Sequence, residues 1–402
     1  MTKTPTTNPA PARRGTVLRA ACALAAAVAL HAVPAAAGDT IRIGVLNSTS
    51  GQFSDLGQRL GEGIRLYMKL HGDTIAGKRV ELVERDDTGP VPDVAKRLTL
   101  ELVTREKVDL LIGYIATPNA LSSIPVAAEA HKPMLLIQAA TAGLTERSPY
   151  VARLSYTLAD MTAPIGQWAA THGIRTVYTI VADYTPGYQG EEAFIKAFTA
   201  AGGRVVGSVK VPLASVDYAV FLQRARNEKP DAVFGFVPAG RAGIAFAKTF
   251  DAMGLAGDGV KLITTGDIVV DSGLDAIGDS ALGVISTFHY SITHDSPENK
   301  AFIKAFHDMY GAEARVDFIT MQAYDAMDAI YTVAARLNGD IDPDKFMAAL
   351  SGLKIASPRG PITIDPQTRN VRQTIYIRRV EKRDGHLYNI EFDTVDPGAA
   401  AR

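Results

Sequence analysis

Short apolar runs and longer segments of mixed polarity alternate along most of the chain. An apolar run of about four to eight residues is typical of a buried strand, and a longer mixed segment is typical of a helix. Nearly continuous apolar strands are expected where both faces of a parallel sheet are covered. In the first part of the chain the pattern predicts strands at 41–46, 80–83, 108–112 and 134–137, and helices at 57–70, 91–106 and 119–130.

The same alternation starts again near residue 177. It predicts strands at 177–181, 205–211, 232–237, 261–263 and 282–286, with helices at 191–201, 218–227 and 242–253. A chain of 402 residues is long for one domain. We therefore predict an α/β protein with two doubly wound parallel-sheet lobes and right-handed crossovers.

The end of the chain departs from this alternation. Helices are predicted at 297–309, 318–337 and 343–350, and antiparallel strands at 362–364, 374–379 and 386–392. The dipeptide Asp384-Gly385 lies before the last strand and favours a hairpin turn.

The first 37 residues have the pattern of a cleaved signal peptide. A basic start precedes an apolar run at 20–33 and the small residues Ala35–Ala37. An uncleaved anchor is the alternative, although the apolar run is short for a membrane span. Cleavage removes four basic residues and the only cysteine, Cys22, and takes the net charge from −1 to −5. We expect export to the periplasm and a mature chain without disulfides.

The net charge and the motifs that are missing argue against several classes of function. A net charge of −1 gives no basic excess for a nucleic-acid partner. The sequence contains no G-x-S-x-G, P-loop, H-E-x-x-H or G-x-G-x-x-G motif. The nearest histidine pair, His289 and His294, has no standard zinc spacing. We therefore expect a protein that is not an enzyme and holds no cofactor or metal.

Several motifs occur in an order that resembles the branched-chain amino-acid binding proteins, which have the type I periplasmic binding fold of ABC importers. The motifs are Ile43-Gly44-Val45, Ser50-Gly51, the segment 83–87, the segment 229–233 and the segment 357–362. The closest likeness, carried by the segment 183–187, is to a branch associated with amino acids or with aromatic and other small carboxylates. The resemblance implies a monomer that serves an ABC permease and ATPase complex.

The resemblance also implies that the chain crosses three times between the lobes. We expect crossings near 154–155, 288–289 and 358–361. The N-terminal lobe would then comprise residues 38–157 plus 288–360, and the C-terminal lobe residues 158–287 plus 361–398.

The ligand site is expected beyond the carboxyl ends of the strands, where two such lobes face each other. The loop after the first strand, which ends at Ser50-Gly51, is rich in hydroxyl groups and suits a carboxylate. An ordinary polar turn is the alternative. The resemblance further implies that Thr117, Ala139 and Thr141 hold the ligand carboxylate, and that the Ala139 carbonyl accepts from an ammonium. Leu56 stands where the family usually has an aromatic residue.

The C-terminal lobe contributes Tyr184, Tyr188 and Phe236 near strand ends, where rings can cover an apolar ligand group. Core packing or a rim position is the alternative for each ring. Asp267 lies near the position of the family's acid for the ligand ammonium, and capping of the next segment is its alternative. We expect a small amino acid, branched-chain or related, to bind by hinge closure. An aromatic or aliphatic carboxylate without an amine, and a ligand-sensing role, remain alternatives.

Overall fold

The computed structural model describes residues 40–395. The predicted signal peptide, residues 38–39 and residues 396–398 lie outside the described part. Within it, no helix has both the length and the apolar character needed to cross a membrane.

The first lobe, called the N-lobe below, is built on a six-stranded sheet in the order β2-β3-β1-β4-β5-β6. The pairs β1–β4, β4–β5 and β5–β6 are parallel, as the apolar runs predict. The strands are β1 (Thr40–Asn47), β2 (Thr74–Ile75), β3 (Lys78–Asp86), β4 (Leu110–Gly113), β5 (Met134–Leu136) and β6 (Val151–Arg153).

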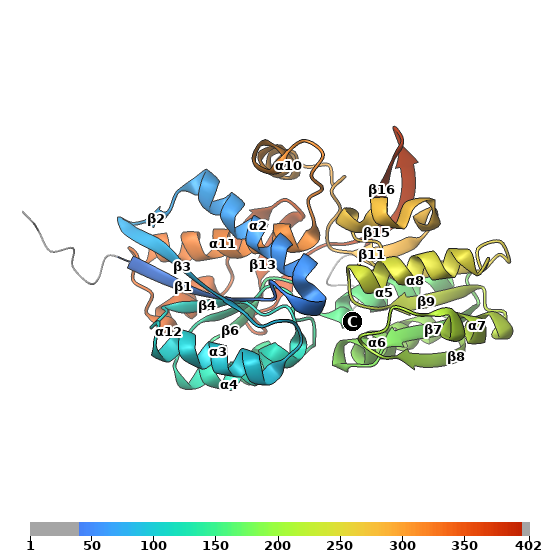
Figure 1. The fold of residues 1–402 in the computed structure, drawn as a ribbon, viewed down its shortest axis with the longest axis horizontal. Coiled ribbons are helices and arrows are strands. Elements are labelled where there is room, and N and C mark those ends of the chain that lie inside the picture. Colours follow the sequence, from blue (N-terminus) through green and yellow to red (C-terminus); the bar gives the residue numbers. More distant parts are fainter. Residues whose placement is uncertain (1–39, 396–402) are drawn as a thin grey trace, which may run out of the picture. The chain divides into compact units, whose positions relative to one another are not determined.

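Alternate residues of β1 point to opposite faces of this sheet. Ile43 and Val45 pack in one cluster with residues of α2 and α11, whereas Leu46 packs with residues of α3 and α4. Figure 1 shows these two helix pairs on opposite sides of the sheet. The N-lobe helices are α2 (Ser54–His71), α3 (Pro92–Thr104), α4 (Thr117–Glu129), α10 (Pro297–Tyr310), α11 (Phe318–Arg336) and α12 (Pro343–Leu350).

The second lobe, the C-lobe, has a seven-stranded sheet in the order β16-β15-β11-β10-β9-β7-β8. Its first five strands in the chain pair in parallel, and β15 and β16 add an antiparallel hairpin at the edge. Asp384 and Gly385 have φ values of 51° and 85°, so they form the predicted turn. The strands are β7 (Thr176–Ala182), β8 (Arg204–Val211), β9 (Ala232–Phe236), β10 (Lys261–Thr265), β11 (Ile285–Phe288), β15 (Ile375–Arg383) and β16 (His386–Val395).

Helices cover both faces of the C-lobe sheet (Figure 1). Val233 packs with residues of α7 and α8, whereas Phe234 packs with residues of α5 and α6. Two α/β lobes with mainly parallel sheets confirm the predicted fold class. The helices are α5 (Leu158–Thr171), α6 (Thr185–Ala200), α7 (Ala219–Glu228), α8 (Arg241–Ala252) and α9 (Leu274–Ile277).

A small third sheet changes the expected position of the last crossing. β12 (Lys354–Ser357), β13 (Gly360–Ile364) and β14 (Val371–Arg372) pair only with one another. Arg369, just before β14, donates to the carbonyl of Val151 in the N-lobe at 3.0 Å. The chain joins the C-lobe sheet only at Ile375. The third crossing therefore comes later than 358–361, because β13 finds its hydrogen-bond partners in β12 and β14.

Buried polar groups fix the crossing segments to one another. Arg359 is 1% exposed, lies 3.0 Å from Asp325, and donates to the carbonyl of Leu154 and to Gln373, each at 2.7 Å. Gln373 in turn donates to the carbonyl of Ser155 at 2.9 Å. The first and third crossings thus share one hydrogen-bonded network.

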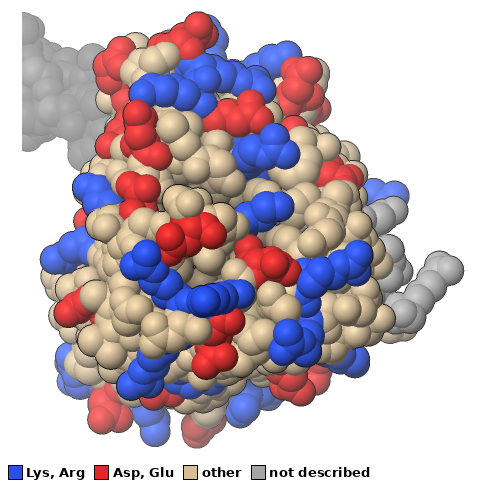
Figure 2. Space-filling view, turned by 90° about the vertical axis from the view of Figure 1, so that its right-hand side faces the viewer, with Lys and Arg blue, Asp and Glu red and all other residues tan. Residues whose placement is uncertain are grey.

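Charges of both signs are interspersed on the face of the molecule shown in Figure 2. Exposed ion pairs of the C-lobe include Arg226–Asp258 at 2.7 Å and Lys382–Asp279 at 2.9 Å. Such exposed pairs contribute little to stability, about 0 to 1 kcal/mol each.

Candidate ligand-binding site

A pocket lies between the carboxyl ends of the strands of the two lobes. It holds about 530 Å³ of space outside the protein atoms, counting its open mouth. The N-lobe lines it with the turn after β4, the turn after β5 and the residues around Phe53; the C-lobe lines it with the segments that follow β7, β8, β9 and β10. We call it the interlobe pocket. The pocket lies where the strand ends led us to expect the ligand site.

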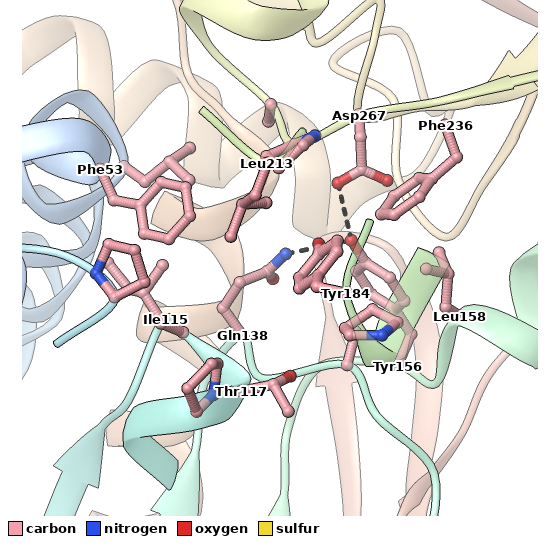
Figure 3. Close-up of a pocket in the computed structure, with 18 residues that line it drawn as sticks. Phe53, Ile115, Thr117, Gln138, Tyr156, Leu158, Tyr184, Leu213, Phe236 and Asp267 are labelled. Atoms are coloured by element: carbon pink, nitrogen blue, oxygen red, sulfur yellow. Dashed lines mark hydrogen bonds between the residues drawn. The ribbon is translucent and has the colours of Figure 1, made fainter. Parts of the chain in front are cut away.

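Asp267 is the one charged side chain among the residues that line the interlobe pocket. It follows β10 and is 3% exposed. Its Oδ1 accepts from the hydroxyl of Tyr156 at 3.0 Å, and its Oδ2 accepts from Thr265 at 2.7 Å. Gln138 donates to the same Tyr156 hydroxyl at 3.0 Å, so three residues form a chain across the pocket wall (Figure 3). Both bonds come from side-chain hydroxyl groups, so neither of them supports the alternative in which Asp267 caps the next segment.

Burial dominates the electrostatics of Asp267. Burial raises the pKa of this carboxyl from 3.8 to about 6, although the hydrogen bonds from Thr265 and Tyr156 and the positive charge of Arg378 act in the opposite direction. Arg378 is fully buried, donates to the carbonyl of Tyr290, and lies 3.8 Å from Asp271. The protein itself therefore supplies positive charge near Asp267.

Hydrogen-bond donors gather at the N-lobe side of the pocket. Thr117 is the first residue of α4, where the leading N–H groups have no acceptor within the helix. The hydroxyl of Thr141 donates to the Thr117 hydroxyl at 3.1 Å, which leaves the Thr117 hydrogen free to point elsewhere. In the described part of the chain, the N–H groups of Ala140 and Thr141 donate to no other residue. These donors suit an anion.

Aromatic rings form the remaining wall. Phe236 ends β9 and is 3% exposed, and its ring is nearly parallel to that of Tyr184, with the centroids 6.2 Å apart and an interplanar angle of 9°. Phe53 comes from the N-lobe, and Leu213 comes from the segment after β8 of the C-lobe (Figure 3). Rings on both lobes can enclose a flat apolar group.

Four predicted residues line the pocket, namely Thr117, Tyr184, Phe236 and Asp267. A fifth, Thr141, does not line it but donates to the Thr117 hydroxyl. Whether they bind ligand stays a prediction.

Ser50 lies elsewhere. It is exposed, and its hydroxyl donates to Asp86 at 2.6 Å. The N–H groups of Thr49 and Ser50 also donate to Asp86, and Ser48 donates to Asp87. The loop after β1 thus already serves two carboxylates of the protein and does not line the interlobe pocket.

Ala139 and Tyr188 also differ from expectation. Ala139 is buried in the N-lobe core, and its N–H donates to the carbonyl of Tyr114 at 3.1 Å. Its neighbours Gln138 and Ala140 face the pocket instead. Tyr188 lies within α6 rather than on a loop, is 45% exposed, and donates to Asp183.

The pocket residues that sequence reasoning missed include Phe53, Gln138, Tyr156 and Leu213. Phe53 supplies an aromatic ring three residues before Leu56, where the family pattern places one. Leu213 and Gln138 follow strands β8 and β5, so the strand-end rule could have found them. Tyr156 lies between β6 and α5, neither of which the apolar pattern predicted.

The model of one protein family matches most of the chain. Residues 40–385 match the family described as periplasmic binding protein. A protein of Brucella melitensis described as "Leu/Ile/Val-binding protein homolog 6" is 39% identical over 383 residues, covering 94% of this chain and 98% of the relative.

Solved structures are similar to the whole described fold. A solute-binding protein of an ABC transporter from Rhodopseudomonas palustris BisB5, in complex with 3,4-dihydroxybenzoic acid, is 44% identical with a TM-score of 0.86, covering 89% of this chain and 98% of that chain. A second solute-binding protein from R. palustris, in complex with 4-hydroxybenzoate, is 41% identical with a TM-score of 0.86, covering 89% and 97%.

Proposed function

The chain belongs to the periplasmic binding protein family, as a solute-binding protein of an ABC transporter, and we propose that its ligand is a small aromatic carboxylate with a hydroxyl opposite the carboxylate, such as 4-hydroxybenzoate. It would bind this ligand in the periplasm and deliver it to a permease and ATPase complex. Of the ligands that the sequence leaves open, this is the carboxylate without an amine.

The donors on the N-lobe side support a carboxylate at that end. Thr117 and the N–H groups of Ala140 and Thr141 can each donate to a carboxylate oxygen. Hydrogen bonds to a charged acceptor contribute more than neutral ones, about 1.5–3 kcal/mol. Because these donors are fixed by α4 and by the turn after β5, they need little rearrangement when the anion arrives.

The surroundings of Asp267 support a hydroxyl rather than an ammonium at the other end. Each oxygen of Asp267 already accepts one hydrogen bond, and Arg378 supplies positive charge nearby. A carboxylate oxygen accepts two bonds, so a phenolic hydroxyl can still donate to Asp267. An ammonium would bring a second cation close to Arg378 and needs three acceptors. This charge balance is the observation that carries the proposal.

The pocket walls and the similar structures also support an aromatic ligand. Rings of Phe53, Tyr184 and Phe236 can flank a planar aromatic group. The two R. palustris proteins hold hydroxybenzoates in their crystals. The name of the Brucella relative favours a branched-chain amino acid as the second candidate, and the experiment below separates the two.

Hinge closure is the mechanism we propose. In the structure the lobes touch where Gln52 donates to the carbonyl of Leu213 at 3.2 Å, and where the Ala142 N–H donates to Gln189 at 2.8 Å. A ligand that contacts both lobes stabilises the arrangement in which they meet.

A thermal-shift panel on the mature protein tests the proposal. Ligand at 100 times its Kd should add about 2.7 kcal/mol of stability. We expect 4-hydroxybenzoate and 3,4-dihydroxybenzoate to raise the Tm, and leucine, isoleucine and valine to leave it unchanged. A shift with the amino acids but not with the benzoates would refute the proposal.

A further inference from the structure

Arg153 is a fully buried cation directly behind the donor side of the interlobe pocket. It ends β6 and is 0% exposed. Its guanidinium donates to the carbonyl of Thr141 and, at 3.2 Å, to the carbonyl of Tyr156, while its Nε has no partner within the described residues. Arg153 therefore fixes two backbone segments whose neighbours form the pocket wall.

Within the described residues, Arg153 forms no ion pair with an acid. Three arginines in the described part of the chain are fully buried, and two of them face acids: Arg359 lies 3.0 Å from Asp325, and Arg378 lies 3.8 Å from Asp271. Among residues 40–395, no carboxylate lies within 4.0 Å of Arg153. The acid whose field reaches it, Asp160, is exposed and accepts from Thr157.

A buried charge without a partner is costly unless another charge compensates it. Burial lowers the pKa of Arg153 to about 10, so the side chain stays positive at neutral pH. The residues that line the pocket include no lysine, arginine or histidine. A ligand carboxylate at Thr117 and Thr141 would thus meet the charge of Arg153 across a single turn of backbone.

We propose that Arg153 is the positioning residue that makes the pocket select an anionic ligand, acting through the Thr141 turn without contacting the ligand. The inference rests on the proposed function, because that function places the ligand carboxylate near Thr117 and Thr141. It assigns to the ligand the counter-charge that Asp325 provides for Arg359 and that Asp271 and Asp267 together provide for Arg378. Selection by charge is distinct from the hydrogen bonds that the turn itself donates.

Calorimetry with a charged ligand and its neutral isostere tests the inference. The probes are 4-hydroxybenzoate and 4-hydroxybenzamide, and the variants are Arg153→Gln, which keeps a donor without the charge, and Arg153→Lys, which keeps the charge. Arg369→Gln is the matched control, because the side chain of Arg369 also donates to backbone carbonyls, that of Val151 in β6 and those of Thr145 and Ser148 before it, but to none in the turn after β5.

We expect the wild type to prefer the benzoate at least a hundredfold. Arg153→Gln should weaken the benzoate at least tenfold and the benzamide less than threefold, whereas Arg153→Lys and Arg369→Gln should keep the wild-type ratio. Equal losses for both probes in Arg153→Gln, or an unchanged ratio, would overturn the inference. If Arg153→Gln does not fold, the ratio of the benzoate affinity to the benzamide affinity in the wild type decides. A ratio near one overturns the inference, and a ratio above a hundred supports it.

The two proposals can fail separately. If the wild type binds no benzoate but binds leucine, the proposed function is wrong, and leucine with leucinamide becomes the probe pair for the same variants. If the wild type binds the benzoate with no loss of discrimination in Arg153→Gln, only the role of Arg153 is wrong.

Discussion

The hydroxyl of Tyr156 donates a 3.0 Å hydrogen bond to Oδ1 of Asp267. Tyr156 lies just after β6 of the N-lobe, and Asp267 follows β10 of the C-lobe. This bond therefore links a crossing segment to the acid of the interlobe pocket. If Asp267 contacts the ligand as proposed, this bond connects ligand recognition to the arrangement of the two lobes.

Removal of that hydroxyl tests the link. Tyr156→Phe keeps the ring but leaves Asp267 without one donor and Gln138 without its acceptor. We expect a loss of about 1–3 kcal/mol in the free energy of unfolding, measured in urea, because buried polar groups lose partners. Tyr178→Phe is the control, since the Tyr178 hydroxyl has no hydrogen bond in the described residues, and it should change stability by less than about 0.5 kcal/mol. Equal effects of both changes would contradict the role of Tyr156.

The pH dependence of stability should reveal the buried carboxyl of Asp267. Its pKa is about 6 in the folded protein against 3.8 normally, so its contribution is fully present below pH 3.8 and is lost as the pH rises through 6. Asp267→Asn cannot ionise. We expect the stability of the variant relative to the wild type to rise by about 2.4 kcal/mol between pH 4 and pH 7.5. A difference that does not change with pH would show that Asp267 is not buried in this way.

In the proposed function, the carboxylate end of the ligand accepts from the hydroxyl of Thr117. Thr117→Val has nearly the same shape but cannot donate, so we expect at least a tenfold loss of affinity for 4-hydroxybenzoate, or about 1.4 kcal/mol or more. Thr117→Ser keeps the hydroxyl and should stay within about threefold of the wild type. Calorimetry measures both. Equal affinity of the valine and serine variants would place the carboxylate elsewhere.

Two of the hydrogen bonds between the lobes, those made by Gln52 and Gln189, should affect ligand release. Gln52→Ala and Gln189→Ala each remove one hydrogen bond between lobes. We expect each change to speed dissociation of the ligand a fewfold in stopped-flow experiments and to leave the ranking of ligands unchanged. The exposed residue Gln167, whose side chain makes no hydrogen bond in the described part, provides the control Gln167→Ala. A change in ligand ranking would mean that these glutamines contact the ligand.

The local sequence pattern is enough to predict the architecture and part of the candidate site. Parallel strands covered on both faces are apolar throughout, so their order is visible without alignment. Tyr184 and Phe236 are predicted because they lie at or just after the carboxyl ends of strands, whereas Thr117 and Asp267 are implied by the family resemblance.

The remaining residues depend on information that a local pattern does not hold. Ala139 was chosen although Gln138 and Ala140 face the pocket, because the orientation of a residue in a turn depends on which carbonyl its N–H finds, here that of Tyr114. β6 has only three residues, too few for a recognisable period, so Tyr156 went unnoticed. The partners of Ser50 on β3 likewise become visible only when β1 and β3 lie together.

Titration calorimetry of the mature wild-type protein with 4-hydroxybenzoate and, separately, with leucine tests the central claim most directly. The balance of charge around Asp267 predicts one-to-one binding of 4-hydroxybenzoate and no heat of binding with leucine. Saturable binding of leucine, with none of 4-hydroxybenzoate, would contradict the account.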